Sequence, residues 1–221
     1  TVAALDEQTC AGAGDSGWVA GFGVAGTYGC TADFSAVTFS VSGVGAQSIK
    51  STGGDTCQRE MTANTTANRI LKFYMRKITT TNDSFRVKTN LSATGAGIDS
   101  DTQMFMGLDA ANIRVYNNLT YTDVGDFSID TNYTVQIKPT DYTNGVETWQ
   151  MAISGIDLGN GAGAFSNNYN MYNYTALNHS VGSKSLAITC GTGSCYVDDI
   201  SDATAVAGGG APKVPDLIWF D

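Results

Sequence analysis

Seven Asn-X-Ser/Thr triplets form the most frequent chemical motif in this 221-residue sequence. The side-chain amide of such an Asn is the acceptor of N-linked glycans, and no triplet has proline in its middle position. The motif therefore predicts a glycosylated protein that is extracellular or at the cell surface. The predicted glycosylation sites are Asn64, Asn82, Asn90, Asn118, Asn132, Asn173 and Asn178.

Residues suited to catalysis are sparse. Glycoside cleavage needs two carboxyl groups that face each other across the scissile bond. Glutamate occurs only at Glu7, Glu60 and Glu147, far apart in the sequence. The only histidine, His179, lies inside a glycosylation triplet, where we expect a glycan-bearing or solvated surface rather than a catalytic cluster. We therefore predict no catalytic residue and no enzymatic activity.

Paired aspartates suggest calcium as the one candidate cofactor besides covalent glycans, because Ca²⁺ binds several carboxylate and carbonyl oxygens. The alternative is that these side chains cap turns and strand ends. The candidate ligands are Asp99, Asp101, Asp198 and Asp199.

An aromatic stretch at Phe165, Tyr169, Tyr172 and Tyr174 has two interpretations. The rings could stack against sugars, or the stretch could fold over the protein with its rings buried and its hydroxyls exposed.

Five cysteines predict disulfides, because thiols pair under oxidising conditions. Cys190 and Cys195 flank Gly-Thr-Gly-Ser between two apolar runs, so we expect them to staple a tight hairpin. One further pair is expected among Cys10, Cys30 and Cys57, in a combination that the sequence leaves open. The remaining thiol would be either buried and free or part of an intermolecular bond.

Charge excludes some partners. The formal net charge is −9 and the isoelectric point is near 4.4, whereas nucleic acids and anionic membranes bind positively charged patches. No apolar run reaches the 18 residues that a spanning helix needs. The sequence starts at Thr1, so we expect that a leader has been removed.

The elements that must position these residues are strands. The sequence has 26 glycines, 3 prolines and no sustained 3.6-residue apolar period, which predicts an all-β protein of ten to twelve short strands in two sheets. Residues 34–44 are one predicted strand. Residues 70–78, apolar and aromatic on both faces, are a predicted central strand. Residues 85–91 alternate, which places Asn90 on the polar face.

Two hairpins are predicted from their turns. Residues 104–108 and 113–116 are joined by Asp109-Ala-Ala-Asn112, which has the composition of a turn. Residues 133–137 and 149–153 alternate on either side of Asn144-Gly145, a strong hairpin signal.

The order of these strands resembles that of concanavalin A-like and laminin-G-like jelly rolls over residues 70–203. The segments that carry the resemblance are Phe85-Arg-Val-Lys-Thr-Asn-Leu91, Met104-Phe-Met-Gly-Leu108, Tyr133-Thr-Val-Gln-Ile-Lys138, Glu147-Thr-Trp-Gln-Met-Ala152 and Cys195-Tyr-Val-Asp-Asp-Ile200. The resemblance implies an antiparallel two-sheet jelly-roll sandwich and carbohydrate binding or adhesion. We expect one domain at 1–203, with a glycine-rich, disulfide-tied portion at 1–60, followed by a glycine linker and apolar strand at 204–221.

That last segment directs the functional hypothesis. A flexible lead followed by apolar residues suits donation of a strand to a neighbouring molecule. We expect a secreted, glycosylated subunit of an extracellular filament, pilus, sheath or surface layer, whose main partners are copies of itself. The alternative is a lectin-like or adhesion module that binds glycans without catalysis. The candidate donor residues are Val214, Leu217, Ile218, Trp219 and Phe220.

Overall fold

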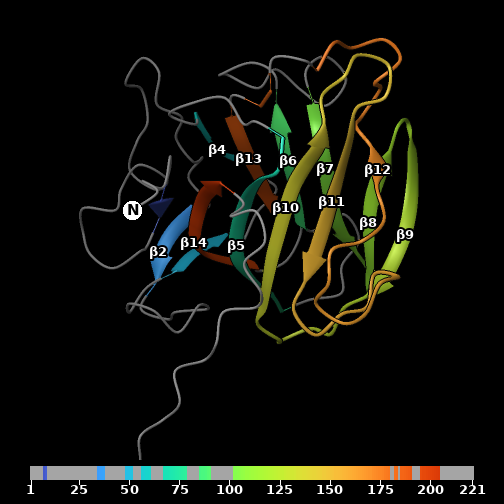
Figure 1. Ribbon diagram of the computed structural model, residues 1–221. Coiled ribbons are helices and arrows are strands. Elements are labelled where there is room, and N and C mark those ends of the chain that lie inside the picture. Colours follow the sequence, from blue (N-terminus) through green and yellow to red (C-terminus); the bar gives the residue numbers. More distant parts are fainter. Residues whose placement is uncertain are drawn as a thin grey trace, which may run out of the picture.

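The computed structural model describes residues 7–8, 34–37, 48–51, 56–60, 67–78, 85–90, 102–179, 182–183, 185–190 and 195–204. They form two antiparallel β-sheets, one behind the other in Figure 1. The predicted all-β, two-sheet sandwich is confirmed. No helix long and apolar enough to cross a membrane occurs within these ranges.

The first sheet has eight strands, with β5 at its centre between β10 and β14. In order across the sheet the strands are β12 (Tyr169–Asn170), β11 (Thr148–Ile153), β10 (Tyr133–Asp141), β5 (Arg69–Lys77), β14 (Cys195–Thr204), β3 (Ser48–Ser51) and β2 (Phe34–Val37), and β1 (Glu7–Gln8) also pairs with β14.

The second sheet has six strands, four of them consecutive in the sequence. In order the strands are β4 (Thr56–Glu60), β13 (Ser185–Cys190), β6 (Phe85–Asn90), β7 (Thr102–Asp109), β8 (Asn112–Asn117) and β9 (Thr120–Asp126).

Both hairpins predicted from turn residues are confirmed. β7 pairs with β8 through Asp109↔Asn112, and β10 pairs with β11 on either side of the Asn144-Gly145 turn. Gly145 has φ 87°, a left-handed conformation that glycine adopts without the steric cost of a Cβ.

The central position of residues 70–78 is also confirmed, but the two faces of β5 differ. Leu71, Phe73 and Met75 are buried, whereas Lys72 and Tyr74 on the other face are only partly buried. One face of β5 therefore packs into the core, and the other is the outer face of the sheet. The long side chains of Lys72 and Tyr74 cover part of that outer face.

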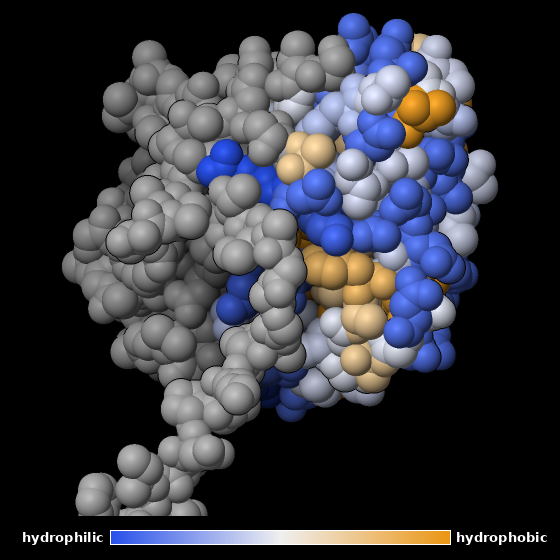
Figure 2. Space-filling model, in the orientation of Figure 1, coloured by the Kyte–Doolittle hydropathy of each residue, from blue (hydrophilic) through white to orange (hydrophobic). Residues whose placement is uncertain are grey.

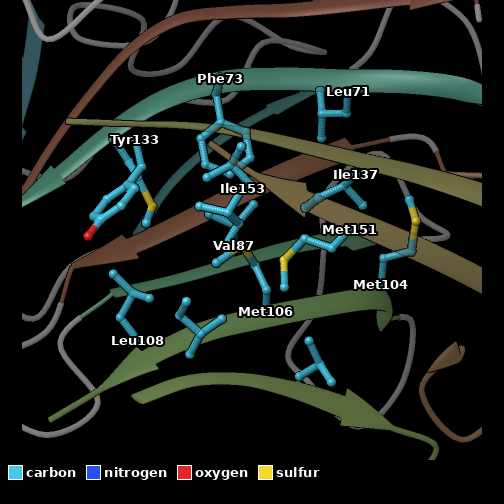
Figure 3. Packing of buried hydrophobic residues seen from close by; sticks show 14 of the residues in the cluster. Leu71, Phe73, Val87, Met104, Met106, Leu108, Tyr133, Ile137, Met151 and Ile153 are labelled. Carbon is cyan, nitrogen blue, oxygen red and sulfur yellow. The ribbon is translucent and has the colours of Figure 1, made fainter. Parts of the chain in front are cut away.

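The core lies between the sheets, where inward side chains of both sheets interdigitate (Figure 3). Phe73 and Ile153 come from the eight-stranded sheet and meet Val87, Met106 and Leu108 from the six-stranded sheet. Each is at most 1% exposed. Burial of this kind is the main favourable contribution to the free energy of folding.

The predicted hairpin of residues 186–188 and 196–200 is wrong. β13 lies in the six-stranded sheet between β4 and β6, whereas β14 lies in the eight-stranded sheet between β3 and β5. Leu186 and Ile188 therefore belong to the inner face of one sheet and Val197 to that of the other. A short connection between two apolar runs suits a crossing between sheets as well as a hairpin, so the local sequence did not distinguish them.

Candidate functional site

A ladder of three aromatic rings lies on the outer face of the six-stranded sheet. Met104 and Met106 of β7 and Val115 of β8 point into the core, so the residues that alternate with them point outward. Register places Tyr116 directly opposite Tyr121 of β9. The third ring belongs to Phe105, and we call Phe105, Tyr116 and Tyr121 the aromatic ladder.

The ladder rings are in contact and become more exposed toward the edge of the sheet. The ring centroids of Phe105 and Tyr116 are 4.8 Å apart and those of Tyr116 and Tyr121 are 3.8 Å apart, both pairs stacked. Phe105 is 1% exposed, Tyr116 is half-buried and Tyr121 is 39% exposed. The ladder therefore presents a supported aromatic surface to solvent at β9.

The β8–β9 turn explains why the two tyrosines meet. Asn117 pairs with Thr120, which leaves Asn118 and Leu119 as a two-residue loop. Asn118 adopts φ 60°, a conformation that Asn tolerates better than most residues. A loop of this length fixes the register, and the register places Tyr116 and Tyr121 side by side.

A clamped arginine adjoins the ladder. Arg114 donates from Nε to Asp123 Oδ1 at 2.6 Å and from Nη1 to Asp109 Oδ2, and its guanidinium carbon lies 6.0 Å from the centre of the Tyr121 ring. The ion pairs hold the planar guanidinium in one orientation, as charge-assisted hydrogen bonds do. A ligand on the ladder would thus meet ring faces and fixed polar groups together.

Residues 169–179, 182 and 183 join the two sheets beside the ladder. Met171 N donates at 2.9 Å to the carbonyl of Glu147, the residue before β11 of the eight-stranded sheet, and Tyr172 N donates to Gln103 O at 2.8 Å in the six-stranded sheet. The ring of Tyr172 meets the Tyr116 ring edge-on, with centroids 5.0 Å apart. We call residues 169–179, 182 and 183 the bridging segment, and its Tyr172 packs against the middle ring of the ladder.

The aromatic stretch in this segment is folded over the sandwich. Tyr169 and Tyr172 are 9% and 6% exposed, so their rings are buried, as in the interpretation of a stretch folded over the protein. Burial raises the pKa of the Tyr169 hydroxyl. The sequence analysis missed the aromatic ladder, whose rings come from three different strands.

His179 is buried, which corrects the expectation of a solvated surface. It is 0% exposed and its Nε2 lies 2.9 Å from Tyr172 O. Because a carbonyl only accepts, this contact requires the tautomer with the proton on Nε2. Gln103 Nε2 also donates to His179 O at 3.3 Å, and Gln103 Oε1 accepts from the Ser183 hydroxyl. His179 thus anchors the bridging segment, a role that its place in a glycosylation triplet concealed.

Glu147 is the charged neighbour of His179. It is 0% exposed, and its Oε2 accepts from Gly145 N at 2.8 Å. Among the described residues, Glu147 Oε1 and His179 Nδ1 have no hydrogen-bond partner. Burial lowers the pKa of His179 below its ordinary value of 6.5, although the Tyr172 carbonyl and the Glu147 carboxylate oppose this shift.

This lowered pKa predicts loss of stability in mild acid. The unfolded chain binds a proton at His179 near pH 6.5, whereas the folded chain resists it until a lower pH. The free energy of unfolding should therefore fall as the pH drops from 6.5 toward the folded pKa, by at most about 1.4 kcal/mol per pH unit. Urea unfolding between pH 7.5 and pH 5 measures the slope.

The matched variant is His179→Gln, because an amide nitrogen can still donate to the Tyr172 carbonyl but does not titrate. We expect a smaller pH dependence for this variant than for the wild type. Identical slopes would contradict the assignment of the buried His179 as the titrating group.

The remaining predicted site residues are not brought together by the described structure. Asp99 and Asp101 lie outside it, as do the side chains of Asp198 and Asp199 in β14. Within the described ranges no group of three or more His, Cys, Asp or Glu side chains could hold a metal ion. Calcium binding therefore stays a prediction.

The predicted glycosylation sites are only partly described. Asn132 and Asn178 are exposed, and Asn118 and Asn173 are half-buried. Asn64 and Asn82 lie outside the described residues, as does the side chain of Asn90.

Cys195 is disulfide-bonded. The side chains of the other four cysteines lie outside the described residues, so the predicted pairings stay predictions. The predicted donor residues Val214 and 217–220 also lie outside them, and the predicted domain boundaries remain untested.

Comparison with known proteins identifies the fold only. No protein-family model and no curated protein matches the chain. A Bacillus subtilis protein of unknown function with a galectin-like fold has a TM-score of 0.52 at 9% identity, over 92% of this chain and 97% of its own. The fold is a galectin-like jelly roll. The predicted resemblance to concanavalin A-like jelly rolls is thus confirmed.

Two further solved structures are similar to this chain. The PL-14 alginate lyase of the mollusc Aplysia kurodai has a TM-score of 0.50 at 10% identity, over 78% of this chain and 87% of its own. The Ca²⁺-bound exoplasmic domain of VIP36 has a TM-score of 0.45 at 10% identity, over 80% of this chain and 84% of its own. Because one fold serves several functions, function must be argued from the site.

Proposed function

We propose that the chain is a carbohydrate-binding module that holds a neutral saccharide on the aromatic ladder. The observation that carries the proposal is the placement of Arg114, held by its two ion pairs, beside the stacked rings of Tyr116 and Tyr121 at the β9 edge of the six-stranded sheet. The apolar face of a sugar ring can stack on an aromatic ring, while its hydroxyls take hydrogen bonds from fixed polar groups.

The charge of the site supports a neutral ligand. Asp109 and Asp123 flank Arg114, so these three side chains together carry a formal charge of −1. The whole chain carries −9. An anionic polysaccharide would be repelled by both, whereas hydroxyl groups can accept from the guanidinium and donate to the carboxylates.

We expect binding without catalysis. The groups in this region best suited to proton transfer are Glu147 and His179, and both are 0% exposed. A general acid or base must come within hydrogen-bond reach of the proton that it transfers. A saccharide on the exposed end of the ladder would be separated from both groups by the bridging segment.

The hypothesis of an extracellular assembly remains a separate prediction. Its donor segment lies outside the described residues, and no contact among the described residues favours self-assembly over sugar binding. An extracellular location suits both hypotheses, and the bonded Cys195 supports it because disulfides persist in oxidising compartments.

The test uses one tyrosine from the outer face of each sheet. The chain is screened against neutral mono- and oligosaccharides, and the best ligand is titrated calorimetrically. Tyr121→Ala should weaken binding about tenfold, because aromatic stacking contributes ~1 kcal/mol beyond buried area. Tyr74→Ala, which removes a half-buried tyrosine from the outer face of the other sheet, should bind like the wild type. Equal affinities for all three proteins would contradict the proposed site.

A further inference from the structure

A second surface feature lies on the outer face of the eight-stranded sheet. A hollow of about 450 Å³ is lined by Arg76, Ile78, Ile129, Asp130 and Tyr196. Its volume falls within the range of small-ligand sites, roughly 300–1,000 Å³. The aromatic ladder lies on the opposite face of the sandwich, so the hollow is distinct from the proposed saccharide site.

Three adjacent chain segments build this hollow. Tyr196 of β14 lies directly opposite Arg76 of β5. On the other side of β5, Asp130 N donates to Lys77 O at 2.8 Å, which seats the turn before β10 against the end of β5. Arg76 Nε donates to Asp130 Oδ1 at 3.0 Å, so this ion pair forms part of the wall.

A predicted glycosylation site stands at the border of the hollow. Tyr133 pairs with Met75 and points into the core, so the preceding residue, Asn132, lies on the outer side next to Arg76. Asn132 is exposed. It is also two residues from Asp130 and three from Ile129, both of which line the hollow.

Continuing the β5–β10 register by one residue beyond Tyr133↔Met75 sets Asn132 opposite Arg76, in one row with Tyr196. Neighbouring strands are about 4.8 Å apart, so Tyr196 lies roughly 10 Å from Asn132, within reach of the first two sugars of a glycan. Figure 2 shows the described part of this face as mostly hydrophilic, with small hydrophobic areas. The first sugars of an N-linked glycan are uncharged and have both hydroxyls and apolar faces. They suit a hollow whose walls combine an ion pair with the Ile129 side chain and the Tyr196 ring.

We propose that the glycan attached to Asn132 folds back onto its own protein and occupies this hollow, with a sugar ring against Tyr196. The attached sugars shield the apolar walls from water, and their hydroxyls accept hydrogen bonds from the Arg76 guanidinium and donate to the Asp130 carboxylate. Because the glycan is covalently attached, it needs little intrinsic affinity to stay there, as an intramolecular ligand has a high effective concentration.

The experiment produces the chain in a secreting eukaryotic host and begins with glycopeptide mass spectrometry at Asn132. Melting temperatures are then compared for the wild type and Tyr196→Ala, each with and without Asn132→Gln. We expect Tyr196→Ala to lower the melting temperature by ~2–4 °C more when the Asn132 glycan is present, a coupling of about 1 kcal/mol. The same four-protein comparison is made with Ile129→Ala, at a 45% exposed position, in case Tyr196→Ala does not fold.

Tyr74→Ala is the control, because Tyr74 lies two residues from Arg76 on the same face of β5 but does not line the hollow. Its effect on the melting temperature should be the same with and without the glycan. An unmodified Asn132 in the secreted protein would overturn the proposal. The proposal would also be overturned if Tyr196→Ala lowered the melting temperature equally with and without the glycan, and Ile129→Ala did the same.

Discussion

Trp149→Ala should destabilise the protein by ~3–5 kcal/mol, the largest single effect that we expect. Trp149 is 0% exposed, its indole Nε1 donates to Asn170 O at 3.2 Å, and its ring centroid lies 5.3 Å from that of Tyr169. The substitution removes core volume and detaches the two-residue strand β12, which pairs only with β11 in the described sheet. Urea unfolding of the purified variant measures the loss.

Val146→Ala provides the comparison for this variant. Val146 is 53% exposed and lies three residues before Trp149. Exposed substitutions of this kind usually change the free energy of unfolding by less than ~0.5 kcal/mol. A loss of less than ~1 kcal/mol in the free energy of unfolding of Trp149→Ala would contradict the role of Trp149 in packing the core and holding β12.

Gln103→Leu should destabilise the protein by ~2–3 kcal/mol, because it removes both hydrogen bonds of a buried side-chain amide. Gln103 is 0% exposed and its side chain contacts both Ser183 and the His179 carbonyl. The His179 carbonyl keeps a second donor, Gly182 N at 3.1 Å, so most of the loss comes from the hydrogen bond between Gln103 and Ser183. The expected change is local, since these contacts hold only the bridging segment.

Hydrogen exchange distinguishes a local change from a global one. In Gln103→Leu, amides of residues 171–179 should exchange faster, while those of β10 should change little. Saccharide affinity should also fall, because the bridging segment positions Tyr172 against the ladder. Gln136→Leu is the matched control, because Gln136 is only half-buried and lies on the outer face of β10. Uniform acceleration in all strands would contradict the local role of Gln103.

The sequence predicted those features that depend on local chemistry. Asp109-Ala-Ala-Asn112 and Asn144-Gly145 specify tight turns by composition alone, so both hairpins were predicted correctly. Two-residue alternation identified the inner faces of β10 and β11 because one face of each strand is buried.

Features that depend on pairing between distant segments were not predicted. β13 and β14 are neighbours in the sequence but lie in different sheets, because each pairs with strands at least 95 residues away. His179 has a polar local sequence, yet Gln103 and Tyr172 provide a buried environment for it.

The aromatic ladder could have been found in part. Tyr116 and Tyr121 flank a four-residue stretch, Asn117-Asn-Leu-Thr120, whose composition fits a hairpin turn. Phe105 lies in the apolar run 104–108, where periodicity does not show that its ring faces outward. The denser aromatic stretch at residues 165–174 drew attention away from the ladder, and two of its rings proved to be buried.

The central claim is that a saccharide binds on the aromatic ladder. A nuclear magnetic resonance titration of isotopically labelled protein with the best-binding neutral saccharide tests it most directly. We predict saturable shifts at Tyr116, Tyr121 and Arg114, with little change at Tyr74 and Gln136 on the opposite face. Shifts confined to the eight-stranded sheet, or no saturable shift with any neutral saccharide, would contradict the account.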